Sequence, residues 1–243
     1  MKSILFLSVI LFGACVDVVD DSVAEDSTDV PRLSSNGMSP SSLQATYLDG
    51  AALTGASVSP YLGTSGSQLF INYMVGCALD STQSITSGSL TFYGIHGLAP
   101  SWSSGALTLS QRRLVSACLL ARTNWSGSNM TISMRGTSPA LSLVGTEGTT
   151  YSKQEGAYYG DLFGGQFTRH VCMGADVIAN PLATQFKTRK CAIDNDQGSS
   201  TSMCDFRIAG DCTSHCTVSG DAYSSCTDLN GTSWAEVIKV NLQ

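Results

Sequence analysis

Nine cysteines constrain this chain more than any other feature of its sequence, because disulfides fix which segments must lie together. They are Cys15, Cys77, Cys118, Cys172, Cys191, Cys204, Cys212, Cys216 and Cys226. An odd number of cysteines in an exported protein means that one of them has another role. Setting Cys15 aside leaves an even set that can pair completely in an oxidising compartment. Many connectivities are open to such a set, so the sequence alone does not give the full disulfide map.

The first residues have the composition of a secretory signal peptide. Lys2 is basic, residues 4–12 are almost wholly apolar, and Gly13 and Ala14 are small. Such a segment is removed on export, so residues 1–14 are predicted to be the signal peptide. Gly13-Ala14-Cys15 resembles the bacterial lipoprotein signal, in which the cysteine becomes the lipidated first residue, although Phe12 replaces the leucine usual in that family. The alternative is an ordinary signal peptide cut near Ala14, which would leave Cys15 as a free thiol.

An acidic, serine-rich segment follows Cys15. Residues 16–30 contain six carboxylates and no base, and two prolines and several serines come shortly after. A segment of this kind buries too little apolar surface to fold, and its like charges keep it extended. Residues 15–44 are therefore predicted to be a flexible tether between the lipid and a single globular domain over residues 45–243. A specific acidic docking arm is the functional alternative for the same residues.

Two capped apolar helices are expected to form the centre of that domain. Thr108 and Gln111 make a capping box before an apolar run that ends at Arg122, and Ser65 and Gln68 have the same spacing before a second run. A helix that is apolar on all sides is buried. Arg112 and Arg113 lie in the first turn of the later helix, where the helix dipole disfavours cations. Each helix carries one cysteine near its end, so a Cys77–Cys118 disulfide is predicted between them.

The fold class predicted is α+β, with mainly antiparallel strands packed on the two helices. Alternating apolar residues indicate strands at residues 90–94, 130–135, 140–144 and 237–242. Strands and helices mix without a regular βαβ order. A β-sandwich with inserted helices is the alternative. Six cysteines lie between residues 172 and 226, so residues 181–230 are expected to be an irregular lobe held by disulfides.

Two short stretches of the sequence resemble metal-binding motifs. Cys212, His215 and Cys216 are close enough in sequence to suggest zinc, but no C-x-x-C pair is present and disulfides account for the cysteines better. Asp194, Asp196 and Gly198 imitate the start of a calcium loop, but the glutamate that completes an EF-hand loop is missing. No metal or cofactor is therefore predicted.

Catalytic residues are also not evident, although one set remains open. There is no G-x-S-x-G motif. A hydrolase of glycans or peptides would use Glu155 or Asp161 together with His96 or His170, because a carboxyl group beside aromatic rings can serve as a general acid. The same segment, QEGAYYGDLFGG, is equally consistent with a loop whose tyrosines cover the core. A sugar-stacking platform would draw on Trp102, Trp125, Tyr158 and Tyr159.

Four short pieces of the chain resemble a set of uncharacterised secreted lipoproteins of soil-dwelling predatory bacteria. They are VGCAL, GLAPSW, VSACLLAR and EGAYYGDLF. The likeness covers residues 66–226, rests on short pieces and not on a catalytic signature, and implies no activity. The formal net charge of −6 argues against a nucleic-acid partner. The favoured function is a non-catalytic, lipid-anchored protein, facing the cell surface or the periplasm, that binds an unknown protein or glycan or interacts with the envelope. The expected location is the bacterial cell envelope, at the outer membrane or cell surface. The alternative is the secreted hydrolase.

Substitution of Cys15 tests the anchor. The variant Cys15→Ser has no thiol to acylate, so the protein should lose its lipid and either leave the membrane fraction or remain unprocessed. Detergent partitioning and the intact mass of the purified protein measure this. Partitioning that is unchanged in the variant would refute lipidation at Cys15.

Overall fold

The computed structural model describes residues 33–43, 51–163, 167–193 and 200–243. Its main sheet has six strands in the order β1-β4-β11-β5-β6-β7, and all neighbouring pairs are antiparallel except β6 and β7. A three-stranded sheet, β10-β9-β8, and a hairpin, β2-β3, complete the strands found in these ranges. The predicted α+β class with mainly antiparallel strands is confirmed. The signal peptide and Cys15 lie outside the described residues.

The strands of the main sheet are β1 (Leu33–Ser35), β4 (Thr131–Arg135), β5 (Lys153–Asp161), β6 (Thr168–Met173), β7 (Arg207–Asp211) and β11 (Ile238–Leu242). The others are β2 (Ser84–Ser87), β3 (Leu90–Tyr93), β8 (Cys216–Ser219), β9 (Ala222–Thr227) and β10 (Ser233–Trp234). The α-helices are α1 (Gly55–Val58), α2 (Ser65–Ala78), α3 (Leu109–Ala121), α4 (Glu147–Thr150), α5 (Ala175–Ala179), α6 (Thr184–Arg189) and α7 (Cys212–His215). Single 3-10 turns are η1 (Pro40–Ser42), η3 (Ser59–Tyr61), η4 (Pro100–Ser103) and η5 (Pro139–Leu141).

The two long helices form where the sequence predicts them. Thr108 caps α3 with the expected capping box to Gln111. The cap of α2 differs, because Thr64 rather than Ser65 accepts the backbone N–H of Ser67. α3 packs on β5 and β11, and α2 packs on α3. None of the helices in the described ranges is long and apolar enough to cross a membrane.

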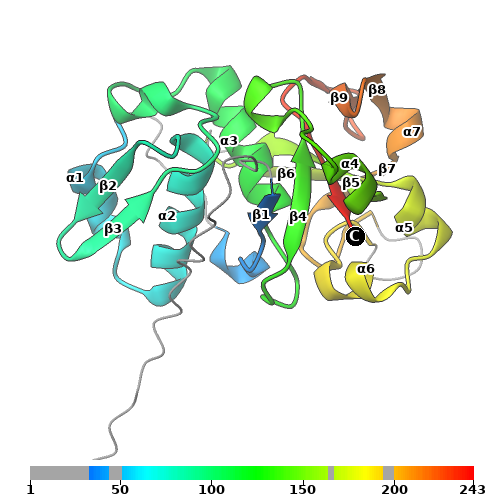
Figure 1. The fold of residues 1–243 in the computed structure, drawn as a ribbon, viewed down its shortest axis with the longest axis horizontal. Coiled ribbons are helices and arrows are strands. Elements are labelled where there is room, and N and C mark those ends of the chain that lie inside the picture. Colours follow the sequence, from blue (N-terminus) through cyan, green and yellow to red (C-terminus); the bar gives the residue numbers. More distant parts are fainter. Residues whose placement is uncertain (1–32, 44–50, 164–166, 194–199) are drawn as a thin grey trace, which may run out of the picture.

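The disulfide between Cys77 and Cys118 joins these helices, with the two Cα atoms 6.0 Å apart. Both sulfur-bearing side chains are fully buried. The other three disulfides join Cys172 to Cys212, Cys191 to Cys204 and Cys216 to Cys226. Cys191 and Cys204 belong to the same buried cluster as Cys77 and Cys118, whereas α7, β8 and β9, which carry Cys212, Cys216 and Cys226, lie at the other end of the molecule from α2 (Figure 1).

β5 is the central strand because both of its faces are covered. Tyr158 points to the face shared with α3, where the apolar side chains of β4 and β11 also lie. Ala157 and Tyr159 point to the opposite face, where they pack with Tyr223 of β9 and Trp234 of β10. The register with β11 shifts beside Val240, which leaves a bulge in β5 near Glu155. Burial on both faces explains why β5 has no clear alternation of apolar and polar residues.

Several expectations from the sequence are wrong in detail. The folded part starts earlier than residue 45, because β1 pairs with β4 and Met38 is fully buried. Residues 140–144 do not form a strand, since Pro139 starts the 3-10 turn η5. The segment around Tyr158 and Tyr159 is the strand β5 and not a loop. The lobe at 181–230 is held by disulfides but is not irregular, since it contains α6, β7, α7, β8 and β9.

Removal of the bridge between the helices tests this arrangement. Closing a loop with a sequence separation of 41 residues should stabilise the fold by about 4 kcal/mol in the chain-entropy account. The double variant Cys77→Ala/Cys118→Ala should therefore lose stability in urea unfolding while its remaining three bridges stay as they are. Peptide mapping of the non-reduced wild type provides the check on pairing. A Cys77 peptide linked to any cysteine beyond residue 170 would show that the helix-pair arrangement is incorrect.

Candidate functional site

The four residues considered for hydrolysis separate into three places. Glu155 is buried, and its two carboxylate oxygens share the N–H of Arg189 Nε, at 2.8 and 2.7 Å, so it belongs to an interior ion pair. His96 is buried beside Ser34, with Nε2 3.2 Å from the serine Oγ. Only Asp161 and His170 come together, in the wall of one pocket.

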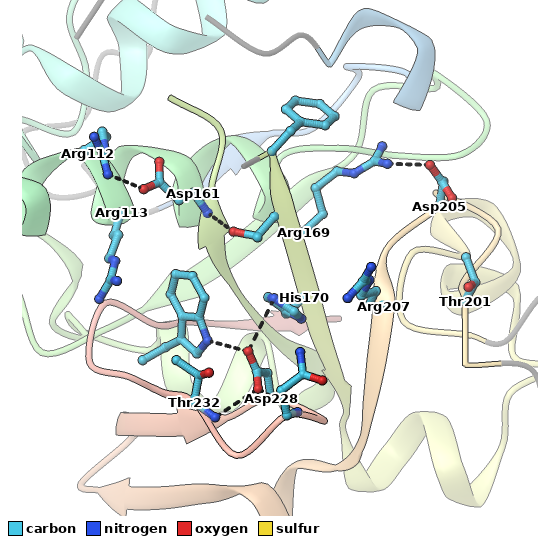
Figure 2. Close-up of a pocket in the computed structure, with 14 residues that line it drawn as sticks. Arg112, Arg113, Asp161, Arg169, His170, Thr201, Asp205, Arg207, Asp228 and Thr232 are labelled. Atoms are coloured by element: carbon cyan, nitrogen blue, oxygen red, sulfur yellow. Dashed lines mark hydrogen bonds and ion pairs between the residues drawn. The ribbon is translucent and has the colours of Figure 1, made fainter. Parts of the chain in front are cut away.

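This pocket lies where β5 ends and β6 begins, beside the first turn of α3 (Figure 2). Its volume is about 720 Å³, which is within the range of small-molecule sites. Side chains from α3, β5, β6, β7 and β10 and from three loops converge on it. The lining residues are Arg112, Arg113, Asp161, Phe167, Thr168, Arg169, His170, Thr201, Asp205, Arg207, Asp228, Asn230, Thr232 and Trp234.

Arg112 and Arg113, which the helix dipole should disfavour in the first turn of α3, both reach into this pocket. Arg112 forms an ion pair of 2.7 Å with Asp161 at the end of β5. Arg113 lies over the ring of Trp234, 4.6 Å from its centroid, and is 4.0 Å from the carboxylate of Glu236. Departures from local sequence preference of this kind are expected at functional sites. The pocket therefore explains why two arginines stand near the start of this helix.

His170 is held between two aromatic rings in the pocket wall. It stacks on Tyr159 with 5.4 Å between centroids, and the ring of Trp234 lies 5.5 Å away on a tilted plane. Its Nε2 is 3.7 Å from Asp228 Oδ2, and its buried Nδ1 has no hydrogen-bond partner among the described residues. Burial lowers the pKa of His170, Asp228 opposes this shift, and the positive charge of Arg207 adds to it. His170 is thus a neutral imidazole near pH 7.

Asp228 is the acceptor at the centre of this wall. Trp234 Nε1 donates to Oδ2 at 3.1 Å, and the backbone N–H groups of Asn230 and Thr232 donate to Oδ1 at 2.8 and 3.0 Å. Burial by itself would raise the pKa of Asp228, but these hydrogen bonds lower it below its ordinary value. A charged Asp228 therefore fixes the loop that connects β9 to β10 against the indole.

The last wall carries two further arginines. Arg169 of β6 pairs with Asp205 and also lies over the ring of Phe167. Arg207 of β7 is the register partner of His170, and its side chain forms no hydrogen bond or ion pair with another described residue. Figure 2 shows it between His170 and Thr201, without an interaction drawn to either. Four arginines and three aspartates line the pocket, and Glu236 adds a fourth carboxylate beside Arg113, so the pocket gathers arginines although the whole chain is acidic.

The zinc site considered from the sequence at Cys212, His215 and Cys216 is not formed. The sulfur atoms of Cys172, Cys212 and Cys216 lie within 4.8 Å of one another, but all three cysteines are in disulfides. Sulfur in a disulfide is not the thiolate that binds zinc. The calcium-like run of Asp194, Asp196 and Gly198 lies outside the described residues.

An aromatic stacking platform is not formed either. Trp102, Tyr158 and Tyr159 have no exposed surface, and only Trp125 is substantially exposed. Trp102 instead packs edge-on against Phe163 inside the core, and its Nε1 donates to the carbonyl oxygen of Ala51.

The sequence does not single out Asp228, Arg207 or Trp234, because they come from separate segments that only the fold brings together. The one available signal is the pair of arginines at the start of α3. Comparisons with known proteins add no further assignment, since no family model, curated protein or solved structure matches this chain.

The lowered pKa of His170 has a measurable effect on stability. In the unfolded chain the imidazole titrates near about 6.5, so the unfolded state takes up a proton first as the pH falls. The stability that the fold gains from keeping the His170 imidazole neutral is present above about pH 6.5 and is lost as the pH falls below it. Urea unfolding should therefore show a lower free energy of unfolding at pH 5.0 than at pH 7.5. This decrease should be smaller in His170→Gln than in the wild type.

The matched control for this measurement is His215→Gln, because His215 lies on α7 and does not line the pocket. That variant should keep the pH dependence of the wild type. An identical pH dependence in the wild type and in His170→Gln would contradict the assignment of a depressed pKa to His170.

Proposed function

We propose that this protein is a lipid-anchored binding protein of the bacterial cell envelope, and that the pocket between α3, β5 and β7 holds its ligand. The observation that carries the proposal is the convergence of charged side chains from separate elements on one concave site. Part of the site is built on the central strand β5 and the buried helix α3, and side chains on such elements are positioned more precisely than those on loops. The acidic tether predicted before β1 would hold this site away from the membrane surface.

Several features support binding rather than catalysis. The described lining residues include no serine or cysteine that could act as a nucleophile. Asp161 is engaged by Arg112 and by the backbone N–H of Phe163, at 3.0 Å, whereas hydrolysis of glycans by paired carboxyl groups needs one of them as a proton donor. A carboxylate whose charge is held by an ion pair and a hydrogen bond can bind a ligand, but it is a poor proton donor. The ligand would be a small molecule or the exposed end of a glycan or peptide.

A secreted hydrolase is the second candidate function, and one observation favours it. His170 is neutral, lies beside the charged Asp228 and has a nitrogen without a partner among the described residues. A histidine oriented by a carboxylate is the usual arrangement of a general base. The candidate requires that this imidazole reach a substrate or a water molecule from its buried position.

A bulky substitution at the mouth of the pocket tests the proposed function. Asn230 is exposed and lines the pocket, so Asn230→Trp should fill it and weaken ligand binding by about tenfold or more. Thr217→Trp is the matched control, because Thr217 is exposed on β8 and lies outside the pocket. Arrays of glycans and peptides probed with the labelled full-length protein measure binding.

Equal binding by the wild type, Asn230→Trp and Thr217→Trp would place the ligand elsewhere and overturn the proposal. Bound array members should also be recovered and weighed by mass spectrometry. Cleaved products that appear with the wild type and disappear with His170→Gln would establish the hydrolase instead.

A further inference from the structure

Resting on the proposed function, we infer that the ligand is an acidic sugar, and that Arg207 binds its carboxylate. Arg207 differs from the other guanidinium groups in the pocket. Arg112 is paired with Asp161 and Arg169 with Asp205, while Arg113 lies on the indole of Trp234 with Glu236 nearby. Arg207 has no such partner among the described residues and is exposed on β7.

The surroundings of Arg207 favour an anion. Its register partner, His170, is only 3% exposed and neutral, and the Nδ1 atom of that imidazole has no partner among the described residues. The nearest acidic lining residues are occupied, since Asp205 is bound to Arg169 and Asp228 is bound to Trp234 and two backbone N–H groups. The charge of Arg207 is therefore left for a ligand.

The chemical class of the ligand follows from the rest of the lining. Arg112, Arg113 and Arg169 each have a carboxylate beside them, so Arg207 is the guanidinium of the lining that is left for an anionic group. A planar guanidinium matches a carboxylate with two parallel hydrogen bonds. Asn230 and Thr232, which are exposed in the lining, offer amide and hydroxyl groups, while the face of Trp234 is covered by Arg113. A polar ligand with hydroxyl groups and a single carboxylate fits this lining better than an apolar one.

Titration with D-glucuronate tests the inference, with D-glucose as the neutral probe and inorganic phosphate as a different anion. The chain has three tryptophans, and only Trp234 lines the pocket. In nitrogen-15-labelled protein the indole N–H signal of Trp234 should shift saturably with glucuronate, and those of Trp102 and Trp125 should not. Glucose and phosphate should produce a much smaller shift at the same concentration.

The variant Arg207→Gln should weaken glucuronate binding by about tenfold, because it removes a charge-assisted hydrogen-bonding pair. Lys187→Gln is the matched control, since it removes an exposed cation of α6 outside the pocket and should leave binding unchanged. Arg207→Lys keeps the charge but not the planar fork, so its affinity should lie between the two. If Arg207→Gln does not fold, the affinity of Arg207→Lys decides whether Arg207 binds the carboxylate of glucuronate.

The outcomes separate this inference from the proposed function. Equal shifts with glucose and glucuronate, or glucuronate binding that is unchanged in both Arg207 variants, would overturn the role of Arg207 while leaving the pocket as a ligand site. Phosphate that binds as tightly as glucuronate would overturn the assignment to a carboxylate. Absence of any shift with glucuronate would overturn the acidic sugar, whereas the proposed function fails only if Asn230→Trp leaves ligand binding on the arrays unchanged.

Discussion

The ion pair between Arg189 and Glu155 is the interaction on which the rest of this structure depends. Both side chains are almost completely buried, and Arg189 also donates to the carbonyl oxygen of Ala121, at 2.8 Å, at the end of α3. The charge of Glu155 and the oxygen of Tyr158 raise the pKa of Arg189 against the opposing effect of burial. One guanidinium thus fixes the bulge of β5, the last turn of α3 and the end of α6. A buried charge of this kind is tolerated only while its partner is present.

The pocket lies at the opposite ends of the same two elements. β5 begins near the ion pair and ends at Asp161, while α3 ends at the ion pair and begins beside Arg112. Cys204 Sγ lies 3.7 Å from the backbone carbonyl oxygen of Arg189, and the disulfide of Cys204 to Cys191 ties the end of α6 to the chain just before Asp205 and Arg207. A core that holds β5 and α3 in place therefore also sets the distance between the pocket walls. Preorganisation of this kind lowers the entropic cost of binding a ligand.

The sequence predicts those parts of the fold that are encoded locally. α3 follows from its capping box and its apolar run, and β4 and β11 follow from clean alternation. The sequence pattern does not predict β5, because the strand is buried on both faces and contains glycines, which are uncommon in strands. Gly156 is required there, since a Cβ would lie 2.4 Å from the carbonyl oxygen of Cys172. The pocket is hidden for a different reason, because Arg113, Asp228 and Arg207 meet only through the order of strands in the sheet, which no local pattern contains.

A double-mutant cycle on Arg189 and Glu155 tests the dependence of the fold on this pair most directly. Glu155→Gln and Arg189→Met should each lower the free energy of unfolding by about 3–5 kcal/mol, because each leaves one buried charge without its partner. The double variant removes both charges and should lose clearly less than the sum of the single losses. Single losses that simply add in the double variant would show that the two side chains act independently, and that the frame of the pocket does not rest on their pairing.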